Sequence, residues 1–291
     1  MLAWLFWTAA VKGEIGIVRT IGLIAGKGKL PLFLAEAVRA RGERLVAVRA
    51  VPEEAVELEA AAVYDIFAGR WGSIVEALKR EGVERVYLAG KISREHLFAG
   101  GEFDERFHRV MASLGRRNDD AVMEAFVEDL AGEGIVVGAQ DEYLSHLLPP
   151  AGLLSSRRPT DEEWRDIARG FEVAKAVAGL DVGQTVVVKA GAVLAVEAID
   201  GTDAAIARGC ALGRGGAVVV KVAKPRQDPR FDVPVVGLET LRTLAEHQAA
   251  VLAFEAGKTL FMERDEAVAL ADARGIAIVS HHQEFESGVS P

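Results

Sequence analysis

Apolar runs alternate with segments of helical spacing along the first half of the chain. The runs predict strands at residues 20–25, 45–51, 63–67, 85–89 and 134–138. The segments between them predict helices at 31–41, 71–81 and 118–131. A strand that is followed by a helix and then by another strand forms a parallel sheet through crossover connections. Residues 18–150 are therefore predicted to form a Rossmann-like α/β domain with a doubly wound parallel sheet.

The second half of the chain also alternates, with strands expected at 184–189, 192–199, 217–223, 233–238, 250–255, 259–262 and 276–279. Helices are expected at 161–178, 202–213, 239–247 and 264–274, the first with Thr160 and Glu163 as a capping box. Only Ala190 and Gly191 separate the first two strands, which predicts a hairpin and hence a mixed sheet. Loop signals between 147 and 160 place the domain boundary, so that residues 151–291 form a second, catalytic α/β domain.

The loop from Lys221 to Pro234 has the most unusual composition in the chain. Two lysines, two arginines, one glutamine and two aspartates occur within these fourteen residues, directly after an apolar run. Pro225 and Pro229 prevent a helix from forming there. A polar loop of fixed conformation at the end of a buried strand is a common place for chemistry in α/β proteins. Its cations suit phosphate oxygens, and its carboxylates suit a metal ion or a water.

Four carboxylates in the second half are candidate metal ligands: Glu197, Asp203, Asp228 and Asp232. Helix capping explains Thr202 or Asp203 and a turn explains Gly201, but neither explains Glu197 at the end of an apolar strand. Mg²⁺ prefers one or two carboxylates together with substrate phosphates, so this set is large enough for Mg²⁺ or Mn²⁺.

Two motifs in the first half have a structural and a functional interpretation. Gly26-Lys27-Gly28 follows a strand and precedes a helix, so it is either a tight turn or a place where amides bind phosphate. It matches neither the dinucleotide fingerprint nor the P-loop. Asn118-Asp119-Asp120 begins a helix, so it is either a cap or a source of carboxylates for a metal.

Composition narrows the class of protein. The formal net charge of -9 argues against a general nucleic-acid binder, which needs a basic surface. The single cysteine, Cys210, excludes an intramolecular disulfide and a cysteine-based zinc site, and it fits a reducing compartment. The histidines are scattered, with no H-x-x-x-H pair, and His281 and His282 are expected in a frayed tail.

The first twelve residues are apolar and contain two of the four tryptophans. They are too few to span a bilayer, which takes about 20 apolar residues, and no basic segment precedes them as in a signal peptide. A membrane-surface anchor, an element docked on the fold and a start site assigned too far upstream all stay open. We treat residues 1–17 as an extension and expect a soluble or peripheral protein.

Six sequence elements occur in one order: Gly22-Leu-Ile-Ala-Gly26-x-Gly28-x-Leu-Pro31, Asn118-Asp-Asp120, Asp181-Val-Gly-Gln184, Val193-Leu-Ala-Val-Glu-Ala198, Gly201-Thr-Asp203 and Lys224-Pro-x-Gln-Asp228-x-Arg230-x-Asp232-x-Pro234. This ordered set resembles the LpxI-type UDP-2,3-diacylglucosamine pyrophosphatases of lipid A biosynthesis. The resemblance covers about residues 20–279. The chain departs from that family by its N-terminal extension and by Asn118, where a glycine is also seen.

The resemblance implies a two-domain protein that holds a UDP-linked diacyl sugar between its domains and hydrolyses it with Mg²⁺. The products would be UMP and 2,3-diacylglucosamine 1-phosphate (lipid X), with Asp232 as the essential residue. Substrate contacts are expected at Gly26, Gly28, Lys91, Asp119, Asp120, Gln184, Thr202, Lys221, Lys224, Gln227 and Arg230. The expected location is the cytoplasm, with peripheral contact at the inner membrane, to which Trp4, Phe6 and Trp7 would contribute, and a homodimer is left open.

Two other classes of protein remain open from the sequence alone. One is a nucleotide-sugar or NAD(P)-linked enzyme built on the N-terminal domain. The other is a non-catalytic module that binds a lipid or a nucleotide.

Overall fold

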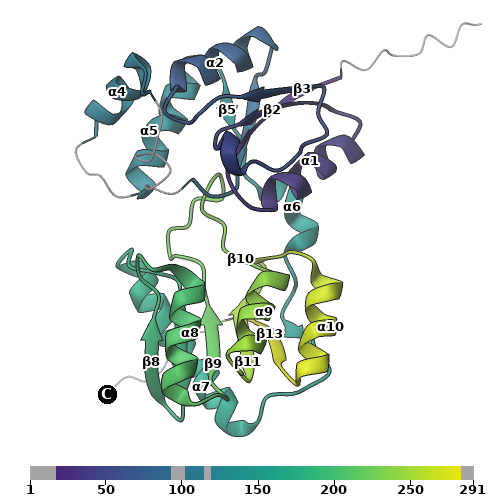
Figure 1. Cartoon of the computed structure of the whole chain (residues 1–291), viewed down its shortest axis with the longest axis vertical. Coiled ribbons are helices and arrows are strands. Elements are labelled where there is room, and N and C mark those ends of the chain that lie inside the picture. The colour runs from purple at the N-terminus through teal and green to yellow at the C-terminus, as the bar shows by residue number, and fades with distance from the viewer. Residues whose placement is uncertain (1–17, 93–101, 115–118, 283–291) are drawn as a thin grey trace, which may run out of the picture.

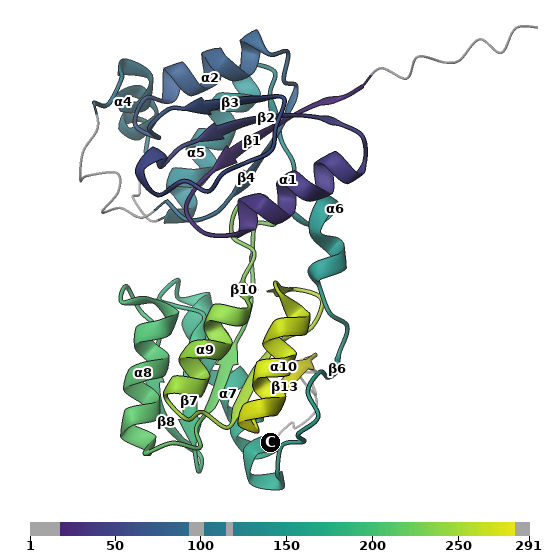
Figure 2. The same ribbon diagram turned by 45° about the vertical axis from the view of Figure 1, so that its right-hand side comes forward.

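The computed structural model describes residues 18–92, 102–114 and 119–282. Two α/β domains lie one above the other along the long axis of the molecule (Figures 1 and 2). Among the described residues, no helix is long and apolar enough to cross a membrane.

The N-terminal domain contains a five-stranded sheet in the order β3-β2-β1-β4-β5. Its strands are β1 (Thr20–Ala25), β2 (Arg44–Arg49), β3 (Ala62–Asp65), β4 (Arg85–Ala89) and β5 (Val136–Val137). All neighbouring pairs are parallel, as expected. The strand order reverses between β1 and β4. In open α/β sheets, the carboxyl ends of the strands at this switch point are where ligands usually bind.

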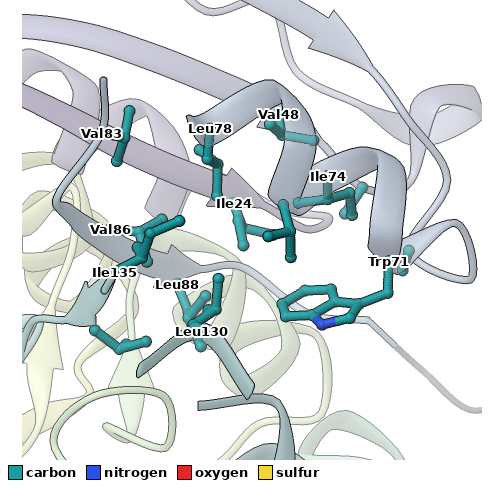
Figure 3. Close-up of a cluster of buried hydrophobic side chains, with 14 of the residues drawn as sticks. Ile24, Val48, Trp71, Ile74, Leu78, Val83, Val86, Leu88, Leu130 and Ile135 are labelled. Atoms are coloured by element: carbon teal, nitrogen blue, oxygen red, sulfur yellow. The ribbon is translucent and has the colours of Figure 1, made fainter. Parts of the chain in front are cut away.

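Helices cover both faces of this sheet because successive side chains of a strand point to opposite sides. Ile21 and Leu23 of β1 belong to a core cluster with α1 (Leu30–Ala40) and α6 (Asp141–Leu144). Ile24 belongs to the opposite cluster (Figure 3), with α2 (Trp71–Arg80), α4 (Glu105–Ala112) and α5 (Asp119–Gly132). The doubly wound arrangement is therefore confirmed. The helices α4 and α6, and the 3-10 turn η1 (Pro52–Glu54), were not expected.

The C-terminal domain contains a six-stranded sheet in the order β6-β13-β11-β9-β7-β8. Its strands are β6 (Gly152–Leu153), β7 (Thr185–Lys189), β8 (Ala192–Val196), β9 (Val218–Lys221), β11 (Val251–Glu255) and β13 (Ala277–His281). The three central strands β13, β11 and β9 are parallel, and the flanking pairs are antiparallel. The mixed sheet and the β7–β8 hairpin are thus confirmed.

One long helix covers one face of this sheet, and three helices cover the other. α7 (Asp161–Gly179) packs on the first face and begins with the expected capping box. α8 (Gly201–Gly213), α9 (Leu238–Glu246) and α10 (Arg264–Arg274) pack on the second face. The short strands β10 (Val235–Val236) and β12 (Leu260–Phe261) pair separately beside the N-terminal domain.

Three local expectations are wrong. The boundary segment was expected to be loop, but it contains the edge strand β6, which pairs with β13, and η2 (Ser145–Leu147) leads into it. His281 does not lie in a frayed tail but ends β13, where its backbone faces Glu255. Helix α8 begins at Gly201, so Thr202 is inside its first turn and does not cap it. A two-residue edge strand and a side-chain bond of Thr202 leave no periodic signal in a sequence.

The segment between β9 and β10, residues 222–234, starts in the C-terminal domain and contacts the N-terminal domain; we call it the junction loop. It rises from β9 to the lower edge of the N-terminal domain and returns to β10 (Figures 1 and 2). Gln140 N–H donates to the carbonyl of Pro229 at 2.8 Å. Phe231 packs against one core cluster of the N-terminal domain, and Val233 packs against the other. This junction loop is therefore anchored in both domains.

Candidate active site

The junction loop starts where the strand pairing of β9 stops. Lys221 is the last residue of β9 paired with both β7 and β11. One more backbone bond, from Val222 N–H to the carbonyl of Gln184, extends the pairing with β7. The chain then turns at Pro225 and again at Pro229, two residues whose fixed φ suits the second position of a turn. The loop thus stands at the carboxyl end of a central strand of the sheet.

Lys224 lies at the centre of this junction. Its Nζ is 3.0 Å from Asp120 Oδ1, 2.8 Å from Asp181 Oδ1 and 2.9 Å from Asp232 Oδ2. These carboxylates come from the first turn of α5, from the residue that ends the turn after α7, and from the junction loop itself. Three segments that are distant in the sequence, and two domains, therefore meet at one ammonium group.

The charges of this cluster do not balance, because three carboxylates face one ammonium. Burial would lower the pKa of Lys224, but its close contacts with the carboxylates of Asp181, Asp232 and Asp120 outweigh that effect and raise the pKa. The pKa of Asp120 is also raised, because its burial outweighs the attraction of Lys224 and because Asp181 and Asp232 add like charge. The cluster therefore favours an additional positive charge.

A second chain of polar contacts begins at Lys221. Lys221 Nζ donates to Thr202 Oγ1 at 3.2 Å, and Thr202 Oγ1 donates to Glu197 Oε1 at 2.7 Å. The other oxygen of Glu197 accepts the N–H of Gln184 at 3.2 Å. Burial lowers the pKa of Lys221, although Glu197 and Asp203 oppose this shift, and the charge of Lys91 contributes to it. Lys91, in the N-terminal domain, thus acts on Lys221 across the junction.

Gln227, Asp228 and Arg230 of the loop make contacts within the loop, and Asp203 makes its contact outside the loop. Arg230 forms a two-pronged ion pair with Asp228, with Nη2 2.6 Å from Oδ2 and Nε 2.9 Å from Oδ1. Burial would raise the pKa of Asp228, but the bonds from Arg230 outweigh it and lower the pKa. The side-chain oxygen of Gln227 accepts the N–H of Lys224. Asp203 lies on α8 and accepts a bond from Thr243 Oγ1 at 3.3 Å.

The glycine motif of the N-terminal domain lies at the switch point between β1 and β4. Lys27 and Lys91 form a two-bond backbone bridge, with both N–H to O distances at 2.9 Å, and Gly26 N–H donates to Ala89. A Cβ atom at position 26 would lie 2.8 Å from the carbonyl oxygen of Lys91. This close approach explains the glycine. The N–H groups of Gly26 and Lys27 thus donate to backbone carbonyls of the same domain, as expected if the motif is a tight turn.

The predicted metal ligands are held in separate contacts. Asp228 pairs with Arg230, Glu197 with Thr202, and Asp203 with Thr243, whereas Asp232 joins the carboxylate cluster. Over the described ranges, no three His, Cys, Asp or Glu side chains form a group that could hold a metal ion alone. Mg²⁺ commonly takes one or two protein carboxylates and completes its shell with substrate phosphates and water. Asp232 and Asp120 fit that requirement, because both place carboxylate oxygens, which are hard donors, next to the same atom, Lys224 Nζ, at 2.9 and 3.0 Å.

Asp181 is the site residue that the sequence reasoning missed. It stands in the Asp181-Val-Gly-Gln184 element, at positive φ (58°) after α7, and a left-handed aspartate is uncommon. Of the predicted substrate-binding residues, Asp120, Gln184, Thr202, Lys221, Lys224, Gln227 and Arg230 lie in or beside the junction. Gly26, Gly28 and Lys91 belong to the switch-point loops. Asn118 and the side chain of Asp119 lie outside the described residues.

The fold and the site define a two-domain α/β protein with an electrostatically unbalanced site between a Rossmann-like domain and a mixed-sheet domain. The LpxI N-terminal domain model matches residues 20–147, and the LpxI C-terminal domain model matches residues 150–279. The chain belongs to the LpxI family.

Two known proteins show how far the likeness extends. UDP-2,3-diacylglucosamine pyrophosphatase LpxI of Caulobacter vibrioides is 34% identical over 273 residues, which cover 90% of this chain and 97% of that protein. The crystal structure of a biotin carboxylase-beta-gamma-ATP complex from Campylobacter jejuni matches 60% of this chain and 36% of that chain, at 15% identity and a TM-score of 0.25. The second likeness is too low to support an argument.

Proposed function

We propose that this protein hydrolyses the pyrophosphate bond of UDP-2,3-diacylglucosamine to UMP and 2,3-diacylglucosamine 1-phosphate, with Mg²⁺ as cofactor. The observation that supports this best is the group of Asp120, Asp181 and Asp232 around Lys224 at the domain junction. Membership of the LpxI family and the name of the Caulobacter vibrioides relative support the substrate.

The residues of the junction suit attack by water on a pyrophosphate. The negative oxygens of the substrate repel a nucleophile, and cations placed around those oxygens reduce that repulsion. Lys221 and Lys224 leave the sheet on the same strand end, and Arg230 follows in the same loop. We assign these three side chains to the substrate oxygens. Lys224 would then exchange part of its carboxylate contacts for phosphate oxygens.

Asp232 is the residue that we assign to the reacting water or to the metal. One of its oxygens is 2.9 Å from Lys224 Nζ, so it stands beside a cation that would bind the substrate. Attack of water on phosphorus breaks the bond to the leaving phosphate oxygen and releases a proton, and we assign Asp232 to accept or to direct that proton. A bound Mg²⁺, held by Asp232 and Asp120, would supply further neutralisation of phosphate charge.

The decisive test is UMP release from UDP-2,3-diacylglucosamine by the wild type and by Asp232→Ala. We expect the variant to keep its fold and to bind substrate, but to turn over at least about 100-fold more slowly, as when one charged catalytic group is removed. Asp265→Ala, an exposed aspartate on α10, is the control and should retain full turnover. Near-normal turnover by Asp232→Ala would refute the assignment, and no UMP from the wild type with any divalent ion would refute the function.

A further inference from the structure

A buried ion pair lies under the junction loop, outside the carboxylate cluster. Glu255 ends β11 and is 5% exposed. Its Oε2 is 2.5 Å from Nζ of Lys175 on α7. Replacement of a buried ion pair by apolar residues is often neutral or stabilising, so stability alone is a weak explanation for such a pair.

Both members of this pair bind the same residue of the loop, Ala223. The N–H of Ala223 donates to Glu255 Oε2 at 3.0 Å, and Lys175 Nζ donates to the carbonyl oxygen of Ala223 at 2.8 Å. The pairing between β9 and β11 ends at Lys221. Where the strand pairing stops, the side chains of Glu255 and Lys175 therefore provide the hydrogen bonds that hold the N–H and the C=O of Ala223.

The residue fixed in this way directly precedes Lys224. Lys224 Nζ contacts Asp232 at 2.9 Å, so a displacement of Ala223 would move the ammonium relative to that carboxylate. Burial would raise the pKa of Glu255, but the hydrogen bonds from Lys175, Lys258 and Ala223 outweigh burial and lower the pKa. Glu255 thus stays charged at neutral pH, and its hold on Ala223 stays charge-assisted.

We propose that Lys175 and Glu255 are positioning residues, which hold Ala223 so that Lys224 and Asp232 keep their mutual geometry in the reaction. The kinetic part of this inference rests on the proposed hydrolysis. The positioning itself does not, because it is visible as protection of backbone amides. Misplacement of reacting groups by about 1 Å can cost 100-fold in rate, so a pair without substrate contact can still control turnover.

The test uses a double variant, Lys175→Met/Glu255→Leu, which removes the hold on Ala223 without leaving an unpaired buried charge. We expect amide hydrogen exchange in residues 222–232 to become at least tenfold faster and kcat to fall by roughly 10- to 100-fold, with a smaller change in KM. The control is Lys258→Met. Lys258 is mostly exposed and bonds Glu255 Oε1 at 2.8 Å but does not hold Ala223, so exchange and kcat should stay within about twofold of the wild type.

A second variant, Glu255→Gln, keeps the size of the side chain and so preserves packing if the double variant does not fold. We expect faster exchange of the same segment, by at least threefold. Wild-type exchange of residues 222–232 in either folded variant would overturn the proposal. The wild type is assayed for UMP in parallel: its failure would refute the proposed function, while the exchange data would still decide the positioning role.

Discussion

Replacement of Lys224 by methionine removes the one ammonium that three carboxylates share. The side chain of Lys224 is 14% exposed, and the carboxylates of Asp120, Asp181 and Asp232 are 34%, 36% and 28% exposed. Pairs that are this open to water contribute up to about 1 kcal/mol each, well below the 3–5 kcal/mol measured for breaking a fully buried pair. Three contacts therefore give an expected loss of up to about 3 kcal/mol at pH 7.

The loss in Lys224→Met should depend on pH in a definite direction. Without the ammonium, the three carboxylates repel one another, and the pKa of Asp120, already raised, rises further. An acid whose folded-state pKa lies above its unfolded value binds protons more tightly when folded, so the folded state gains stability as pH falls through the folded pKa. The variant should therefore recover part of its deficit between neutral and mildly acidic pH.

Scanning calorimetry at pH 7 and pH 5 measures both effects. A loss of about 3 kcal/mol corresponds to a decrease in Tm of roughly 6–12 °C for domains of this size. Lys29→Met is the matched control, because Lys29 forms a single ion pair between the domains, 2.6 Å from Glu263, and is 44% exposed. That variant should lose no more than about 1 kcal/mol. A deficit of Lys224→Met equal to that of the control, or one that does not shrink at pH 5, would refute the reasoning.

Two further predictions concern the switch point and the second lysine of the site. Gly26→Ala should destabilise the protein by about 1–3 kcal/mol in thermal unfolding, because the new Cβ would lie 2.8 Å from the carbonyl oxygen of Lys91. Gly132→Ala is the control: no atom lies within 4 Å of its Cβ position, so stability should change by less than about 1 kcal/mol. The charge of Lys221 should be lost as pH rises through its lowered pKa, so kcat/KM for hydrolysis should begin to fall at a pH below the ordinary lysine pKa of about 10.4. Lys221→Arg should move that fall in kcat/KM to higher pH, because arginine keeps its charge. An equal loss in the two glycine variants, or an unchanged alkaline limb in Lys221→Arg, would contradict these predictions.

The sequence predicted the fold class because the local signals are strong and consistent. Apolar runs of strand length, the capping box at Thr160 and the glycine between β7 and β8 each act over a few residues. The missing pieces depend on distant partners. The edge strand β6 exists because β13 supplies its hydrogen bonds, and α4 packs Phe107 against Phe103 and against Phe126 of α5. The two residues of β6 leave no periodic pattern, whereas α4 carries Phe107, Val110 and Met111 at helical spacing, a local signal that the prediction did not use.

The candidate site was predicted less completely, for the same physical reason. The charges and prolines of the junction loop are visible in the sequence, and they identified Lys224 and Asp232. Their partners Asp120 and Asp181 lie more than forty positions away, and only the fold brings them to one ammonium. Equally, a sequence shows that Asp228 and Arg230 are two residues apart, but not that they bind each other in a two-pronged ion pair.

The position of Lys224 links the domain arrangement to the chemistry that we propose. Its ammonium binds Asp120 of the N-terminal domain and Asp181 and Asp232 of the C-terminal part of the chain. Any ligand that adds negative charge beside Lys224 competes with these carboxylates, and a cation bound by Asp232 or Asp120 repels the ammonium. In the reaction that we propose, binding of a phosphate-bearing substrate with a metal ion would therefore weaken a contact that also joins the domains. Under that proposal, substrate affinity and domain contact would be thermodynamically coupled at Lys224, each opposing the other by the same free energy.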